Sequence, residues 1–146
     1  MEKTSTTRQT SVHVPIGTHW LQGDLGIPEH AHGIVLFAHG SGSSRRSPRN
    51  QLVARALERR GLATLLIDLL TSQEEAVDEI TAQYRFDLPT LASRLVDIVK
   101  WLRQNPATRT LPIGLFGAST GGGAALMAAA ARPDEIVTVG VARRPA

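Results

Sequence analysis

Four short apolar runs, separated by segments with helical spacing, place the strongest limit on how this chain can fold. The runs span 33–38, 63–69, 111–116 and 136–141. Their length and continuous apolar character predict strands that are covered on both faces. Between them, apolar residues recur at helical spacing after Pro48, after Asp87 and after Ser119. Strands that alternate with helices predict βαβ units, and therefore an α/β fold with a mostly parallel, doubly wound sheet.

The segment before the first apolar run has a different pattern. Apolar and polar residues alternate over 11–16 and again near 20–25, with Gly17 between the two stretches. This spacing predicts a β-hairpin at the edge of the sheet. Residues 1–10 are polar, so we expect a flexible start, and we predict neither a signal peptide nor a membrane span. A single domain over 1–146 is the simplest organisation.

Composition excludes several classes of chemistry. The chain has no cysteine, which rules out disulfides, a thiolate nucleophile and cysteine-bound metals, and which fits a cytoplasmic location. The net charge of +3 comes mostly from arginine, which forms short clusters at 45–46, 59–60 and 143–144. Aromatic residues make up only 4% of the chain, so these pairs lack the interleaved aromatics of a nucleic-acid surface. We interpret them as solvated surface.

The third apolar run leads directly into Gly117-Ala118-Ser119-Thr120-Gly121 and then into an alanine-rich helix. A Gly-x-Ser-x-Gly turn between a buried strand and a helix is the setting of a nucleophile elbow. The glycines on either side of Ser119 allow a tight turn that presents its hydroxyl group to a substrate. The helix that follows favours negative charge near its first residues. A loose helix start or an anion-binding turn would give the same pentapeptide.

A second glycine-rich segment, His39-Gly40-Ser41-Gly42, follows the first apolar run. In a parallel sheet it emerges at the same edge as Ser119, where a backbone N–H can approach a substrate carbonyl. We predict that the N–H groups of Ser41 and Thr120 form an oxyanion hole, with Gly40, Gly42 and Gly121 lining it. A plain loop whose histidine only binds the backbone is the alternative.

Three segments together resemble the dienelactone-hydrolase-like branch of the α/β hydrolases. They are Val35-Leu36-Phe37-Ala38-His39-Gly40-Ser41-Gly42, Leu65-Leu66-Ile67-Asp68-Leu69-Leu70 and Ile113-Gly114-Leu115-Phe116-Gly117-Ala118-Ser119-Thr120-Gly121. The resemblance implies hydrolysis of small esters or lactones through an acyl-enzyme, without metal or organic cofactor. Dienelactone hydrolase itself uses cysteine, so Ser119 makes this chain more similar to the serine esterases of the group.

The rest of a catalytic triad is not evident from the order of residues. In this fold an acidic residue and then a histidine follow the serine. The carboxylates that follow Ser119 in this sequence are Asp134 and Glu135, and no histidine follows it. The resemblance implies later strands that 1–146 does not contain. Among the five histidines, only His39 is expected on the same edge as Ser119, so we predict a Ser119–His39 pair with Asp68 as the nearby acid. A role for Asp68 in pinning a loop is equally consistent.

Without later strands, the run 136–141 would form a bare apolar edge of the sheet, which favours a homo-oligomer. A partner chain could then supply a histidine. The function expected is that of a small carboxylesterase. A non-catalytic protein that keeps the pocket, and an incomplete fragment of a longer hydrolase, are the alternatives.

Overall fold

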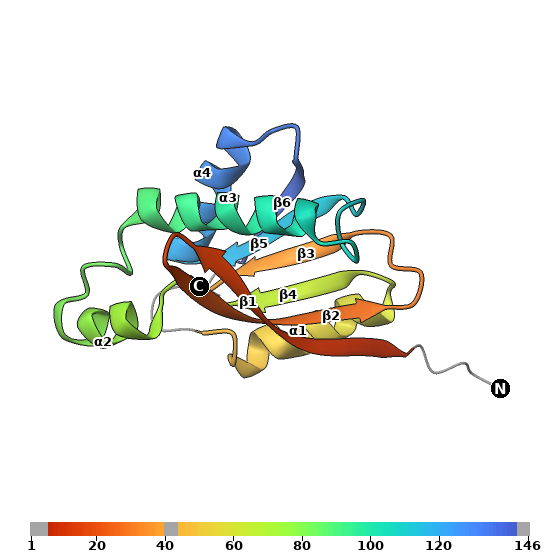
Figure 1. Cartoon of the computed structure of the whole chain (residues 1–146), viewed down its shortest axis with the longest axis horizontal. Helices are drawn as coiled ribbons and strands as arrows, with labels where there is room; N and C mark the ends of the chain where they lie inside the picture. Colours follow the sequence, from red (N-terminus) through yellow and green to blue (C-terminus); the bar gives the residue numbers. More distant parts are fainter. Residues whose placement is uncertain (1–5, 40–43, 143–146) are drawn as a thin grey trace.

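The computed structural model describes residues 6–39 and 44–142, which form one six-stranded sheet with helices on both faces (Figure 1). The elements are β1 (Thr7–Ile16), β2 (His19–Pro28), β3 (Ile34–Ala38), α1 (Pro48–Arg59), β4 (Ala63–Ile67), α2 (Ser72–Thr81), α3 (Leu88–Gln104), β5 (Ile113–Ala118), α4 (Thr120–Ala131) and β6 (Ile136–Ala142). The strand order is β1-β2-β4-β3-β5-β6. Strands β3 to β6 run parallel, while β1 and β2 are antiparallel to their neighbours. The predicted mostly parallel α/β sheet is confirmed.

The predicted hairpin is present, and it is longer than the alternation indicates. Strands β1 and β2 have ten residues each and pair along their whole length. The turn between them contains Gly17 with a φ of +57°, a value that glycine adopts without strain. Because β1 already begins at Thr7, the expectation of a flexible segment as far as Thr10 is wrong for its last four residues.

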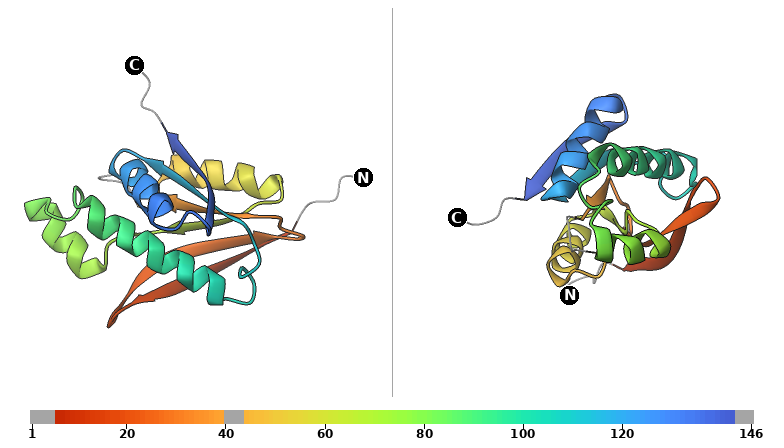
Figure 2. Two further views of the ribbon diagram at one scale, coloured as in Figure 1. Left: turned by 90° about the horizontal axis from the view of Figure 1, so that it is seen from above. Right: turned by 90° about the vertical axis from the view of Figure 1, so that its left-hand side faces the viewer.

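Helices α3 and α4 cover one face of the sheet, and α1 covers the other (Figure 2). Side chains along β3 alternate between the two layers, as in any strand. Ile34 and Leu36 belong to the larger core under α3 and α4, whereas Phe37 packs with Ala54 of α1 and Leu66 of β4. Each face of the central strands is therefore apolar, which explains the continuous apolar runs.

Local capping signals set where the helices begin. The side chains of Ser47 and Asp87 accept hydrogen bonds from the first turns of α1 and α3, as the sequence predicts. The acidic stretch 73–79 lies within α2. Thr71 and Glu74 form a reciprocal capping box at its start. The position of α2 at the end of β4 follows from these contacts.

Candidate active site

Ser119 occupies the junction between β5 and α4, and its backbone has an unusual conformation. Strand β5 ends at Ala118, α4 begins at Thr120, and Ser119 between them has φ 57° and ψ −129°. Such angles cost a non-glycine residue on the order of 1–3 kcal/mol and occur mostly where function requires them. The residue is exposed at the carboxyl edge of the sheet. The predicted strand–turn–helix context of the serine is therefore present.

The two flanking glycines are required by close backbone contacts. A Cβ atom at Gly117 would lie 2.6 Å from the carbonyl oxygen of Gly121. A Cβ atom at Gly121 would overlap the carbonyl oxygen of Ala38 and lie 2.6 Å from that of His39. The start of α4 thus packs directly against the end of β3, which places Ser119 beside the central strand.

The first turn of α4 places backbone N–H groups next to Ser119. The carbonyl oxygen of Ser119 accepts hydrogen bonds from the N–H groups of Gly122 and Gly123. The side chain of Ser119, at the N-cap position, makes no capping hydrogen bond with this helix. The amide of Thr120 precedes these two, in the part of a helix where N–H groups have no partner within the helix. This position suits the predicted oxyanion role of Thr120 and Gly121. Gly40, Ser41 and Gly42 lie outside the described residues.

His39 contacts the end of β4. Its Nε2 atom accepts a hydrogen bond from the N–H of Leu69 at 3.0 Å and lies 4.0 Å from a carboxylate oxygen of Asp68. In a neutral imidazole one nitrogen accepts and the other carries the proton. With Nε2 accepting, this tautomer has no second lone pair for the proton of Ser119. The Ser119–His39 pair stays a prediction, and this contact counts against it.

Asp68 is buried and binds Arg45 twice. One carboxylate oxygen accepts from the Arg45 backbone N–H at 2.8 Å, and the other accepts from the guanidinium at 2.7 Å. The guanidinium also lies 3.4 Å from a carboxylate oxygen of Asp24 on β2. Arg45 is only 16% exposed, so its interpretation as solvated surface is wrong. Asp68 therefore holds the chain where it enters α1.

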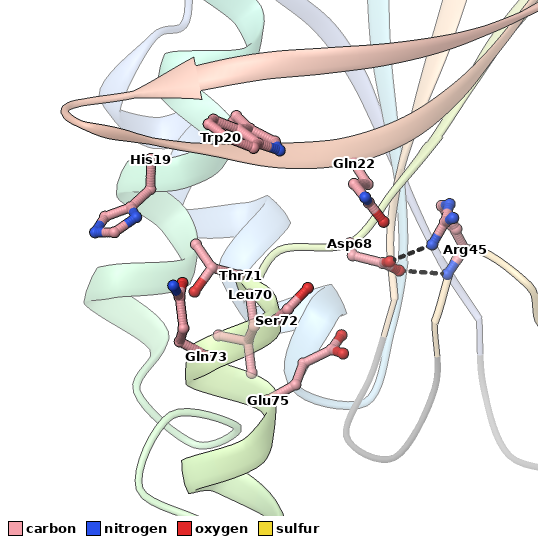
Figure 3. Close-up of a pocket in the computed structure, with 10 residues that line it drawn as sticks. All are labelled: His19, Trp20, Gln22, Arg45, Asp68, Leu70, Thr71, Ser72, Gln73 and Glu75. Carbon is pink, nitrogen blue, oxygen red and sulfur yellow. Dashed lines mark hydrogen bonds and ion pairs between the residues drawn. The ribbon is translucent and has the colours of Figure 1, made fainter.

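A polar pocket of about 340 Å³ opens beside this ion pair at the carboxyl end of β4 (Figure 3). Its wall on β2 is formed by His19, Trp20 and Gln22, and Arg45 and Asp68 close one side. The remaining wall is the start of α2, from Leu70 to Gln73 together with Glu75. We call this cavity the β4-end pocket. It was not predicted, because its lining residues come from segments that are far apart in the sequence.

Two neighbouring carboxylates on α2 have opposite pKa shifts. Burial acts to raise the pKa of Glu74, but hydrogen bonds from Arg94 and from the Thr71 amide outweigh it and leave the pKa below its usual value. Burial and the negative charge of Asp68 raise the pKa of Glu75. The Arg94 guanidinium also donates to the carbonyl oxygen of Leu69 at 2.9 Å. The ion pair between Arg94 and Glu74 holds α2 in place, and α2 forms one wall of the β4-end pocket.

Within 6–39 and 44–142, no group of three or more histidine, aspartate or glutamate side chains could hold a metal ion. In the same residues, no helix has both the length and the hydropathy that a membrane crossing requires.

Comparison with known proteins supports a hydrolase fold. No family model matches the chain. The crystal structure of dienelactone hydrolase from Anabaena variabilis is 57% identical with a TM-score of 0.90, over 92% of this chain and 62% of that protein. Est1E from Butyrivibrio proteoclasticus is 18% identical with a TM-score of 0.73, over 88% of this chain and 49% of that one, which shows the shared fold.

Two curated relatives from Mycobacterium tuberculosis, strains H37Rv and CDC 1551, carry a different name. Each is 53% identical over 123 residues and is provisionally named a phosphoribosyl transferase. The match covers 84% of this chain but only 27% of each relative. The chain thus spans about a quarter of the length of these proteins.

Proposed function

Because the chain has the α/β-hydrolase fold and is similar to a dienelactone hydrolase over nearly all of its length, we propose that it is a serine carboxylic-ester hydrolase. It acts on small esters or lactones through an acyl-enzyme at Ser119. The strained, exposed backbone of Ser119 is the observation that carries this proposal. We do not propose phosphoribosyl transfer for this chain, because the match covers only 27% of each mycobacterial relative.

The proposed reaction begins with attack of the Ser119 hydroxyl oxygen on the ester carbonyl carbon. A serine–acyl bond forms, the bond to the alcohol oxygen breaks, and the alcohol leaves with a proton. Water then hydrolyses the acyl-enzyme and restores the hydroxyl group. Negative charge that develops on the carbonyl oxygen is stabilised by the amide of Thr120 and by the positive end of α4. The predicted second donor is the amide of Ser41.

The source of the general base separates two forms of the proposal. If His39 turns to Ser119 during the reaction, His39→Gln should lower the rate of ester hydrolysis by about a hundredfold or more. If the base comes from a partner chain, His39→Gln should change the rate only through the lost contact with the Leu69 amide. The rates of p-nitrophenyl acetate hydrolysis by the parent and by His39→Gln distinguish the two.

We assign Asp68 to the loop rather than to a catalytic triad. Its two contacts with Arg45 pin the segment just before the α1 cap, and Nε2 of His39 pins the end of β3 to Leu69, which follows Asp68. Removing a partner from a buried ion pair costs about 3–5 kcal/mol. Asp68→Ala should therefore lower the free energy of unfolding strongly. Asp68→Asn, which can still accept from the Arg45 amide, should lower it less.

A fluorophosphonate probe tests the nucleophile directly, because it reacts covalently with activated serines. The parent protein should be labelled at Ser119 and should hydrolyse p-nitrophenyl acetate, while Ser119→Ala should do neither. Ser93→Ala, which alters an exposed serine on α3, is the matched control and should behave like the parent. Equal labelling and equal hydrolysis by the parent and Ser119→Ala would refute the proposal.

The contact between His39 and Leu69 favours one alternative, a binding protein that keeps the fold but does not turn over substrate. In that case the probe labels Ser119, but p-nitrophenyl acetate releases at most one equivalent of nitrophenol. Repeated turnover excludes this alternative.

A further inference from the structure

The β4-end pocket lies on the same edge of the sheet as Ser119. Both follow the carboxyl ends of parallel strands, and β3 is the only strand between β4 and β5. Neighbouring strands are about 4.8 Å apart, so the end of β4 is roughly 10 Å from that of β5, and β2, which carries Trp20, is roughly 14 Å from it. A substrate whose ester group sits at Ser119 needs an arm of about 14 Å to reach between Trp20 and Glu75.

The pocket has an excess of negative charge. Arg45 is already shared between Asp24 at 3.4 Å and Asp68 at 2.7 Å, so this trio carries one net negative charge. Glu75 adds a second charge, and in the described chain no ion pair neutralises it, whereas its neighbour Glu74 pairs with Arg94. Burial and the negative charge of Asp68 raise the pKa of Glu75, against the opposite effect of the Arg45 guanidinium. Bringing a positive group into the pocket would relieve this repulsion.

An aromatic ring completes the pocket. Trp20 lines it from β2 and is 55% exposed (Figure 3). The ring stacks on His13 with centroids 5.8 Å apart and an interplanar angle of 24°, which fixes its orientation. An indole face attracts cations more strongly than any other side-chain ring. Trp20 and Glu75 thus border the same cavity from opposite elements, β2 and α2.

We propose that the β4-end pocket binds a positively charged group of the substrate, an ammonium or a guanidinium, between Glu75 and Trp20. This inference rests on the proposed function, because it takes Ser119 as the reacting residue. It predicts a preference for esters that carry a cation about 14 Å from the carbonyl carbon.

The test compares two esters of the same shape. The p-nitrophenyl esters of 11-aminoundecanoate and of dodecanoate differ only by an ammonium in place of a terminal methyl group. In the parent, kcat/KM should be about tenfold higher for the amino ester, the size expected for one cation–aromatic and carboxylate contact. Glu75→Gln and Trp20→Leu should each reduce this ratio severalfold. Because each ratio is taken within one variant, general damage to the enzyme cancels.

The control variant is Glu79→Gln, which removes an exposed carboxylate from the same helix but outside the pocket. It should keep the ratio of the parent. A ratio near one in the parent, or a ratio that Glu75→Gln leaves unchanged, overturns the inference while the esterase proposal stands.

A binding measurement covers the case in which neither ester is turned over. Titration calorimetry with hexylammonium chloride, and with hexanol as the neutral counterpart, needs no catalysis. Binding of hexylammonium alone, weakened at least severalfold in Glu75→Gln, supports the pocket even if Ser119 proves inactive. Equal behaviour of the two ligands overturns it. Failure of the proposed function is recognised separately, by the absence of repeated turnover of p-nitrophenyl acetate.

Discussion

Replacing Gly121 with alanine should both destabilise the protein and slow the reaction of Ser119. The added Cβ would overlap the Ala38 carbonyl oxygen and lie 2.6 Å from the His39 carbonyl oxygen. Both oxygens belong to the end of the central strand, so α4 has to move instead. Overpacking typically costs 1–3 kcal/mol, and two backbone contacts place this case at about 2–3 kcal/mol. A displacement near 1 Å at a reacting group lowers rates by about a hundredfold.

The assay combines urea unfolding with the rate of fluorophosphonate labelling, and Gly123→Ala is its control. A Cβ at Gly123 would lie 3.2 Å from Cδ1 of Leu88, a side chain that is partly exposed and can rotate away. Alanine is also preferred over glycine within a helix by up to about 1 kcal/mol. Gly123→Ala should therefore be as stable as the parent or slightly more so, with the same labelling rate. If Gly121→Ala has the same stability in urea and the same labelling rate as the parent, the close packing of α4 against β3 does not explain why this position is glycine.

Three further predictions follow from the described contacts. Ser119→Gly should be about 1 kcal/mol more stable than Ser119→Ala in urea, since only glycine adopts a positive φ without cost; equal midpoints would contradict the strain. The lowered pKa of Glu74 means that its contribution to stability is present above pH 4.5 and is lost as the pH falls through the lower value of the folded state. Glu74→Gln should therefore lose less stability than the parent on acidification, as followed by circular dichroism, and identical pH dependence would argue against the role of Arg94. We also propose that β6 pairs with a second copy of the chain, because this edge strand leaves Val137 67% exposed. Light scattering should find a dimer for the parent and a monomer for Val137→Lys, and a monomeric parent would refute the pairing.

Much of the fold can be predicted because its signals are local. An apolar run of strand length, a capping residue such as Asp87 and the glycines around Ser119 each act over a few neighbouring residues. The helical character of α2 was less evident, since its sequence is polar and part of its stabilisation comes from Arg94 on another helix. Its capping box, Thr71 with Glu74, was the signal that would have found it.

The details of the site depend on contacts that sequence spacing does not reveal. Arg45 and its two ion-pair partners, Asp24 and Asp68, come from three different segments. From the sequence, Arg45 and Arg46 are interpreted as solvated surface, because adjacent arginines usually are solvated. This interpretation misses the ion pairs of Arg45. For His39, topology predicts the correct edge of the sheet, but it does not determine that Nε2 meets the Leu69 amide. Position on an edge is a property of the fold, whereas the hydrogen-bond partner depends on side-chain packing.

The strand order also determines when the protein can fold during its synthesis. The central strand β3 pairs with β4, which is made about 30 residues later, and with β5, which is made about 80 residues later. Contacts between such distant segments form slowly, and an unpaired apolar strand is prone to aggregate in the meantime. β3 therefore stays without one of its two neighbours until the ribosome has released β5. The turn at Ser119 follows at once, so the core and the nucleophile become available at nearly the same point of translation.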